Sequence, residues 1–478
     1  MAILAFRTRS LATGRGRHGA AGGARRESLA IVSTDSELCG IAAYTAALRG
    51  QLDDIFDVTV FNLDQALLRS RYRRVRHIAD AHVNEICSHL AEFDSVNLQL
   101  EHGTLGLEPR DIFRRFRWLA AAAARLSVTF HTLPSPLPLD GTGFLLTLLS
   151  CEFAKAGDMR REFERNRLLS NGIGRYLRKT QRRKQVTAIV HNRRDAHQLH
   201  YLHGIDRVLD HPLAFLSPTE AAAVHGRTSR RRFPALDHLP DDTKLIGVFG
   251  FLNDYKGFGT VIRALHQLPP EYHLLIFGGT HPNEIRVGQR IHPYLSALFD
   301  EAYANASVYE HISSRAGEYA PHLTLAADAN LAALIGPHPR DLSSRIHFMG
   351  ALPDADFLNG MAICDAAVFP YLEVGQSSSG PISQALELGC RIIASRTHAF
   401  LEFAKYHPQA FEFFDIGNHV ELAAHIQARR QFPAVESPEF NTETNKAIYL
   451  LANSERGIAP AGPAARKTSA PSEEQAKR

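Results

Sequence analysis

Short apolar runs that alternate with helical stretches are the feature that most constrains how this chain folds. The first run, residues 29–33, precedes a turn at Cys39-Gly40-Ile41, after which apolar residues recur at helical spacing. Four further runs follow in this half of the chain, at 58–61, 95–100, 127–130 and 187–190. Strands that alternate with helices predict a parallel sheet covered by helices on both faces.

A second series of the same kind begins after a basic linker around Arg230, Arg231, Arg232 and Pro234. Its strand candidates lie at 244–249, 273–277, 345–349, 366–369 and 391–394. The fold class is therefore α/β, with two Rossmann-like parallel sheets joined near residue 235. Residues 281–342 are long for a crossover, and we interpret them as an insertion or an elaborated connection.

The composition excludes several classes of protein but does not identify a function. A chain of 478 residues with 45% hydrophobic and 22% charged side chains suits two or three globular domains. The five cysteines show no metal-ligand or disulfide spacing, which favours a reducing compartment. No apolar run reaches the ~20 residues that span a bilayer, and a net charge of +4 implies no nucleic-acid partner.

Both ends of the chain have the composition of disordered segments. Residues 1–26 carry six arginines and no acidic residue, which suits a flexible arm or, alternatively, a transit peptide. We predict five segments, which are a disordered extension over 1–27, sheet domains over 28–235 and 236–410, a helical segment over 411–456 that can pack back on the first domain, and a disordered tail over 457–478.

The first candidate site is the loop Gly250-Phe-Leu-Asn-Asp-Tyr-Lys256-Gly257, which lies between a strand and a helix that begins near Phe258. Backbone N–H groups at a helix N-terminus point outward, and a lysine adds a full positive charge. This pattern favours a phosphate cradle. The alternative is an ordinary loop with a solvent-exposed lysine.

The second candidate is the turn Pro370-Tyr371-Leu-Glu-Val-Gly375-Gln376-Ser-Ser-Ser379-Gly380-Pro381, between the strand that ends at Phe369 and the next helix. Serine caps the free N–H groups of a helix and proline suits its first turn, so helix capping alone also explains the pattern. The position favours a site, because this turn follows a strand of the same sheet as the lysine loop.

Taken in order, residues 248–265, 274–278, 345–350 and 365–389 resemble the C-terminal domain of retaining GT-B glycosyltransferases of the family-four type. The resemblance implies two Rossmann-like domains that face a cleft. It also implies transfer of a sugar, with retention, from a nucleotide-diphosphate sugar to a glycan, lipid-linked or other acceptor. Such enzymes use no metal and no cofactor besides the donor, and they work in the cytoplasm, in some cases at the inner face of the membrane.

The resemblance also assigns a role to the two loops. The donor diphosphate would be held by Lys256 and by the backbone around it and across the cleft, at Gly40, Gly250, Ser378, Ser379 and Gly380. Fixed donors aimed at developing negative charge are usually the largest catalytic term.

The resemblance also assigns a role to His131, Gln376 and Gln384. His131, after the strand 127–130, would contact a sugar hydroxyl, although a buried structural histidine explains it equally well. His102 and His191 also follow strands. Gln376 and Gln384 stand where the family has two glutamates, and Phe251 stands where it often has an arginine. Glutamine can hydrogen-bond a sugar or ribose hydroxyl, but it cannot act as a base.

The helix expected over 111–125 is amphipathic and basic. It carries Arg114, Arg115 and Arg117 beside an apolar face, and a helix of this kind can lie on anionic lipid or simply cover a core.

Three other functions stay open at the level of sequence. A glycosyltransferase-like protein that binds nucleotide without catalysis is suggested by the two glutamines. A nucleotide-sugar epimerase would share the two-sheet architecture. A nicotinamide enzyme is disfavoured because no GxGxxG follows the first strand.

Overall fold

The fold is described from a computed structural model of the chain. It describes residues 12–13, 25–35, 40–134, 140–279, 293–302, 342–373, 375, 377–428 and 439–455. Most of the predicted extension, most of the 281–342 insertion and the predicted tail lie outside these residues. None of the helices in the described ranges combines the length and the apolar character needed to cross a bilayer.

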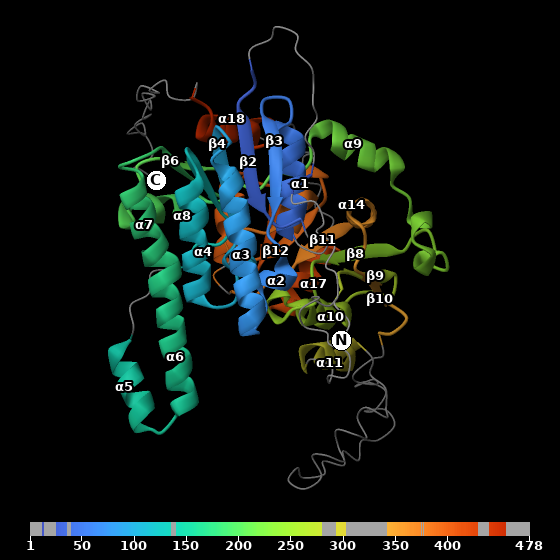
Figure 1. Cartoon of the computed structure of the whole chain (residues 1–478). Coiled ribbons are helices and arrows are strands. Elements are labelled where there is room, and N and C mark those ends of the chain that lie inside the picture. The colour runs from blue at the N-terminus through green and yellow to red at the C-terminus, as the bar shows by residue number, and fades with distance from the viewer. Residues whose placement is uncertain are drawn as a thin grey trace, which may run out of the picture.

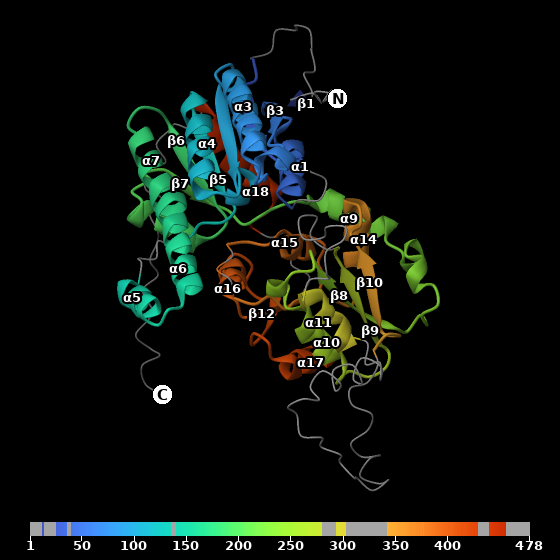
Figure 2. The same ribbon diagram turned by 60° about the horizontal axis from the view of Figure 1, so that its bottom comes forward.

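Two parallel sheets form the architecture, as predicted (Figures 1 and 2). The first sheet has the order β1-β3-β2-β4-β5-β6-β7, in which β1 pairs antiparallel with β3 and the other pairs are parallel. Its central strands are buried along their whole length, which is why they read as continuous apolar runs. The strands are β1 (Ala12–Thr13), β2 (Ser28–Ser33), β3 (Asp57–Asn62), β4 (Ser95–Leu100), β5 (Leu126–Phe130), β6 (Val186–Val190) and β7 (Val208–Asp210).

The second sheet has the order β10-β9-β8-β11-β12-β13, with every pair parallel. The strand order therefore reverses between β8 and β11, and ligands of open α/β sheets bind in the crevice at such a reversal. The strands are β8 (Lys244–Phe249), β9 (Tyr272–Phe277), β10 (Ile346–Gly350), β11 (Ala366–Phe369), β12 (Ile392–Ser395) and β13 (Phe411–Phe414). The helical segment predicted over 411–456 thus opens with a strand, whose phenylalanines pack on β12 and on the core.

Helices cover both faces of the first sheet (Figure 1). Its apolar interior is closed by side chains from α3, α4 and α7 on one face and from α1 on the other. These helices and turns are α1 (Gly40–Leu52), α2 (Gln65–Leu68), α3 (Arg73–Leu90), η1 (His102–Thr104), α4 (Pro109–Ala122), α5 (Gly141–Leu149), α6 (Phe153–Asn166), η2 (Arg167–Gly172), α7 (Ile173–Thr180), α8 (Arg193–His197) and η3 (Gln198–Leu202).

The second sheet is covered in the same way, with α10, α11 and α17 on one face and α9, α14, α15 and α16 on the other. Helix α9, which precedes the boundary predicted near residue 235, packs on α14 of this sheet. The elements are α9 (Pro218–Arg227), η4 (Arg230–Arg232), η5 (Pro234–Leu236), η6 (Asp254–Lys256), α10 (Phe258–Leu265), α11 (Pro293–Ala302), α14 (Asp354–Ala362), α15 (Gly380–Glu387), α16 (His398–Ala404) and α17 (His419–Gln427).

The last helix, α18 (Thr442–Asn453), returns to the first sheet and packs on α1, β4, β5 and β6 (Figure 2). Tyr449 is fully buried there, and its hydroxyl lies 2.9 Å from Oγ1 of Thr129 and 3.4 Å from Nε2 of Gln99. We call the first sheet with its helices and α18 the first lobe, and the second sheet with α9 to α17 the second lobe.

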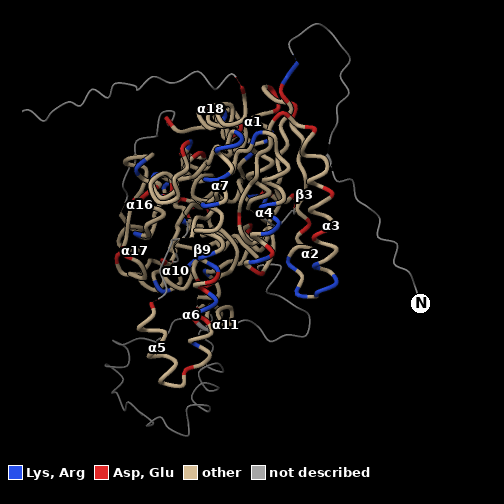
Figure 3. Tube along the Cα trace, turned by 60° about the vertical axis from the view of Figure 1, so that its left-hand side comes forward, with Lys and Arg blue, Asp and Glu red and all other residues tan. Residues whose placement is uncertain are grey.

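Helix α4 does not present the three predicted lipid-facing arginines. Arg115 is completely buried, where its Nε donates to Asp80 and its Nη1 to the carbonyl of Leu105. Arg114 is paired with Asp80 as well, at 2.6 Å. Only Arg117 is exposed, and it lies over the ring of Tyr176. The hypothesis of a basic face on lipid is therefore wrong for this helix. Charges of both signs are interspersed over the chain trace (Figure 3).

Candidate functional site

The lysine loop follows β8 and the serine turn follows β11, so both candidate loops leave the sheet at the point where its strand order reverses. Gly250 and Gly257 have positive φ angles of 118° and 65°. A Cβ built on Gly257 would lie 2.0 Å from the carbonyl oxygen of Pro370, so the backbones of the two loops are in close contact here. Helix α10 begins directly after Gly257, and its first N–H group, that of Phe258, donates to the hydroxyl of Tyr294 at 3.3 Å.

This contact yields a stability prediction. Replacing Gly257 with alanine should lower the free energy of unfolding by about 1 kcal/mol for the left-handed backbone, plus about 1–3 kcal/mol for the clash. Gly389 is a matched control, because its φ is 66° and its Cβ position is open. Urea unfolding of the two alanine variants isolates the clash. Equal losses in both variants would show that the two loops are not in contact.

Lys256 ends the loop as a buried cation. Its side chain is only 5% exposed, and its Nζ donates to the hydroxyl of Tyr371. The ammonium also lies over the rings of Tyr371 and Tyr255, at 3.8 and 4.9 Å from their centroids. Burial lowers the pKa of Lys256 to about 7. Within the described residues no carboxylate lies within 4 Å of this ammonium.

The serine turn reaches the same lysine through Tyr371. The hydroxyl of Ser379 lies 3.0 Å from the Tyr371 hydroxyl, and it makes no capping bond to helix α15. Simple helix capping, the alternative interpretation of this serine, therefore does not describe it. The N-cap residue of α15 thus leaves the first N–H groups of this helix without a side-chain cap. Lys256, Tyr371 and Ser379 form one cluster, which we call the lysine cluster.

The remaining predicted residues of the second lobe lie around this cluster. Gly250 packs against the lysine stem, with its Cβ position 3.1 Å from Cε of Lys256. Gly380 begins α15, and its Cβ position is 3.1 Å from the ring of Phe215. Ser378 and Gln384 are half-buried, and Gln376 lies outside the described residues.

The two lobes meet beside the lysine cluster. The backbone N–H of Leu133 donates to the hydroxyl of Ser377 at 3.3 Å, and Nδ2 of Asn192 donates to the carbonyl of Ser377 at 3.1 Å. Glu387, in the last turn of α15, accepts from the backbone N–H groups of Phe215 and Leu216. Burial raises the pKa of Glu387 to about 8. Through these two hydrogen bonds Glu387 holds the segment that joins the lobes.

The first lobe carries a row of histidines at the carboxyl ends of its strands. His102, His131, His191 and His211 directly follow or nearly follow β4, β5, β6 and β7, four neighbouring strands. Nε2 of His131 lies 2.7 Å from Oε1 of Gln99, and its ring is buried against those of Tyr44 and His191. Burial lowers the pKa of His131 below its ordinary value.

His131 and Gly40 are not joined to the lysine cluster by any hydrogen bond or ring contact among the described residues. Gly40 is exposed at the start of α1, with open space around its Cβ position. Tyr371 and Ser377 lie in the second candidate turn, although the sequence assigned neither a role of its own, and Asn192 is the residue that sequence reasoning missed.

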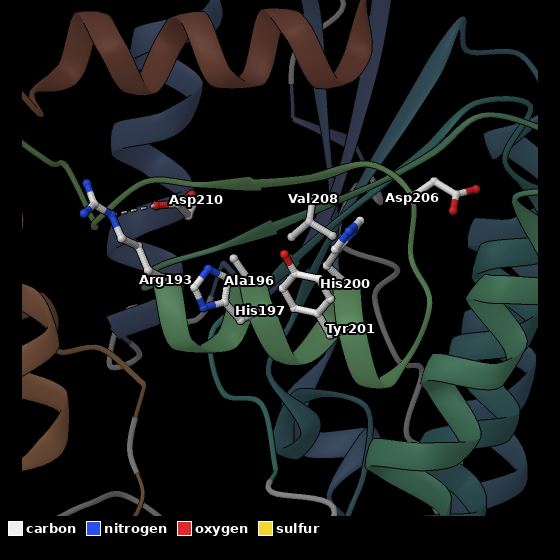
Figure 4. Close-up of a pocket in the computed structure, with 8 residues that line it drawn as sticks. All are labelled: Arg193, Ala196, His197, His200, Tyr201, Asp206, Val208 and Asp210. Atoms are coloured by element: carbon white, nitrogen blue, oxygen red, sulfur yellow. Dashed lines mark ion pairs between the residues drawn. The ribbon is translucent and has the colours of Figure 1, made fainter. Parts of the chain in front are cut away.

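A separate pocket of about 350 Å³ lies on the first lobe, between β7 and the helices α8 and η3 (Figure 4). Arg193 and Asp210 face each other at its rim, 3.9 Å apart. None of the predicted site residues belongs to it. It is lined by Arg193, Ala196, His197, His200, Tyr201, Asp206, Val208 and Asp210.

Compared by sequence, the chain matches no protein-family model and no curated protein. Compared by structure, it resembles several solved proteins over most of its length. An Anabaena protein, Alr3699/HepE, solved with UDP and glucose, superposes with a TM-score of 0.51 at 13% identity, over 89% of this chain and 98% of that one.

Two trehalose-phosphate synthases are similar to the same extent. The α,α-trehalose 6-phosphate synthase of Burkholderia multivorans gives a TM-score of 0.52 at 11% identity, over 90% of this chain and 94% of that one. The UDP-forming α,α-trehalose-phosphate synthase of Burkholderia xenovorans gives 0.53 at 13% identity, over 91% and 100%. With two parallel sheets whose carboxyl edges meet, and with these likenesses along nearly the whole chain, this protein has the GT-B fold of glycosyltransferases.

Proposed function

We propose that this protein transfers a sugar from a nucleotide-diphosphate sugar to an acceptor hydroxyl. The observation that carries the proposal is Lys256, a buried ammonium with a hydroxyl and two ring faces around it and no carboxylate partner among the described residues. A buried cation without a counter-ion is costly, so such a site favours an anionic ligand. The cation stands at the crevice where the strand order of the sheet reverses.

A diphosphate suits the groups around this lysine. The N-terminus of α15, which its N-cap Ser379 leaves without a side-chain cap, lies beside it, and backbone N–H groups at helix N-termini bind phosphate oxygens. When the bond to the sugar breaks, negative charge grows on the diphosphate, and these fixed donors stabilise that charge. The similar Anabaena protein was solved with UDP and glucose, which supports a uridine nucleotide as the first donor to test.

The donor has to displace one internal contact. In the structure the Tyr371 hydroxyl accepts the hydrogen bond of Lys256, and Ser379 in turn contacts Tyr371. A phosphate oxygen that replaces the tyrosine offers the lysine a full negative charge. The pKa of Lys256 should then rise from about 7, because an opposite charge favours the protonated form.

Retention of configuration, independence of metals and a glycan or lipid-linked acceptor complete the proposal. Each has a direct readout. The anomeric configuration of the product can be followed by NMR, and activity should survive removal of divalent cations with EDTA. We place the enzyme in the cytoplasm, at the inner face of a membrane when the acceptor is lipid-linked.

The experiment that tests the proposal is a thermal-shift screen of UDP, GDP, ADP and dTDP against the full chain at pH 6.5. A ligand that binds only the native state at 100 times its Kd stabilises it by ~2.7 kcal/mol, so one diphosphate should raise the melting temperature clearly. No response to any of the four would overturn the proposal.

The same screen gives a pH prediction. Above pH 7 the free lysine is increasingly neutral, so diphosphate binding must take up a proton. The affinity should therefore fall as the pH rises, by up to about tenfold per pH unit above 7 until the pKa of the bound state is reached. Titration calorimetry at pH 6.5 and 8.5 measures it. An affinity that is unchanged, or that rises with pH, would exclude Lys256 as the titrating ligand.

A protein that binds the nucleotide without catalysis is the second candidate. Gln384, at the family's second glutamate position, is a half-buried amide and supplies no charge. This candidate predicts the same thermal shift, with neither transfer to an acceptor nor slow hydrolysis of the donor. An assay for free sugar after prolonged incubation with the donor separates the two.

A further inference from the structure

Helices α5 and α6 form a hairpin that projects from the first lobe. In all three views α5 lies beside the outer end of α6, away from the strands of both sheets (Figures 1, 2 and 3). The other end of α6 continues through η2 into α7, and η2 packs on α4, which anchors the hairpin. The outermost element of the first lobe is thus a helix of nine residues.

The surface of α5 is apolar and open. Leu145, Leu146 and Leu149 are 57%, 59% and 71% exposed, and Phe153 at the start of α6 is 67% exposed. Residues 141–151 contain no charged side chain. A soluble protein carries scattered exposed apolar residues, whereas a contiguous group on a projecting element marks a site of contact with another apolar phase.

The distribution of these side chains indicates what that phase is. At 100° per residue, Leu145, Leu146, Leu148 and Leu149 spread over about half of the helix circumference, and only Thr147 on this helix is buried against the hairpin. A helix that packs on one protein neighbour usually presents a narrower stripe. Lipid tails surround a projecting helix from every open side, so a broad apolar surface suits them.

The charges of the hairpin begin where the apolar tip ends. Lys155 pairs with Glu152 at 3.2 Å, and Arg161 pairs with Asp158, so the two signs nearly balance along α6. Such a belt can sit among lipid headgroups while the tip lies deeper. Because the balance is close to neutral, the attachment should depend on apolar burial more than on anionic lipid or low salt.

We propose that α5 inserts into the surface of a lipid bilayer and attaches the first lobe to it. At ~1.5 Å per residue, nine residues reach about 14 Å, which suits shallow insertion and is too short to span a bilayer. The attachment uses no residue of the lysine cluster, so a test of the attachment does not depend on the proposed reaction.

Vesicle flotation of the full chain tests the proposal, with phosphatidylcholine vesicles alone and with added phosphatidylglycerol. Wild type should float with both, in 50 and in 500 mM salt. The double variant Leu145→Glu/Leu149→Glu should lose at least tenfold in the floating fraction. The control is Ile78→Glu/Leu202→Glu, whose positions are 55% and 66% exposed elsewhere on the first lobe, and it should float like wild type.

Two other outcomes would overturn the proposal. Wild type that stays with the soluble fraction in both vesicle types shows that α5 does not bind lipid. A wild-type dimer that becomes monomeric in the α5 variant, measured by sedimentation without vesicles, shows instead that a second copy covers the helix.

A second readout follows the tip itself. Cys151 is exposed, whereas the thiols of Cys87, Cys364 and Cys390 are shielded and burial raises the pKa of each. A polarity-sensitive dye on Cys151, in a Cys39→Ser background, should shift to shorter emission wavelength when vesicles are added. An unchanged spectrum with floating protein would place the contact elsewhere and refute the insertion of α5.

Discussion

Replacing Lys256 with methionine should abolish the thermal response to nucleotide diphosphates and lower kcat/KM for sugar transfer by roughly 100- to 1000-fold, the usual effect of removing one donor aimed at developing charge. The stability of the protein should not fall with it. Burial lowers the pKa of Lys256 from 10.5 to about 7, so folding near neutral pH works against the protonated lysine. A methionine of similar length removes that cost, and the melting temperature of the free protein should stay level or rise.

The prediction is specific because activity and nucleotide binding should fall while the melting temperature should not. A structural lysine would lose stability and activity together when it is replaced. Lys405, which is exposed and pairs with Glu402 at the end of α16, is the matched control, and Lys405→Met should leave both the nucleotide response and the activity intact. A Lys256→Met protein that still responds fully to the diphosphate would remove the central residue of the proposed site.

The second large effect concerns Arg115. Its replacement with alanine should lower the free energy of unfolding of the first lobe by about 3–5 kcal/mol, because breaking a buried ion pair leaves its partners unsatisfied. The guanidinium is fully buried and donates to Asp80 at 2.8 Å and to the carbonyls of Leu105 and Leu68 at 2.7 and 3.3 Å. The melting temperature of this lobe should drop by on the order of 10 °C.

Arg117 provides the control on the same helix. It is exposed and contacts ring faces, so Arg117→Ala should change stability by no more than about 0.5 kcal/mol. Circular dichroism during heating and in urea measures both variants. Equal losses for the two arginines would show that the network around Arg115 contributes little.

The arginines of α4 also show what a sequence pattern can and cannot supply. At 100° per residue Arg115 lies about 40° from Leu119, on the apolar side of the helix, so the helical pattern could have predicted that Arg115 is buried. The pattern could not predict the ion-pair partner of Arg115. Asp80 comes from α3, 35 residues earlier, and only tertiary packing brings the two together.

The central strands could be predicted because each is an apolar run buried on both faces. The short β7 and β13 could not, since β7 has three half-buried residues and β13 alternates buried with half-buried ones. The same limit applies to the site. Lys256 and Ser379 follow from strand ends and helix starts, whereas the hydroxyl of Tyr371 that links them depends on a contact between loops that are far apart in sequence.

The return of α18 to the first lobe has a consequence for biosynthesis. Residues 442–453 complete the interior of a unit that begins near residue 28, and Tyr449 is enclosed there by Thr129 and Tyr44. During translation the amino-terminal half therefore cannot close until residues 442–453 have been synthesised, whereas the middle of the chain can fold before that. Premature termination upstream of codon 442 should thus damage the oldest part of the nascent polypeptide first.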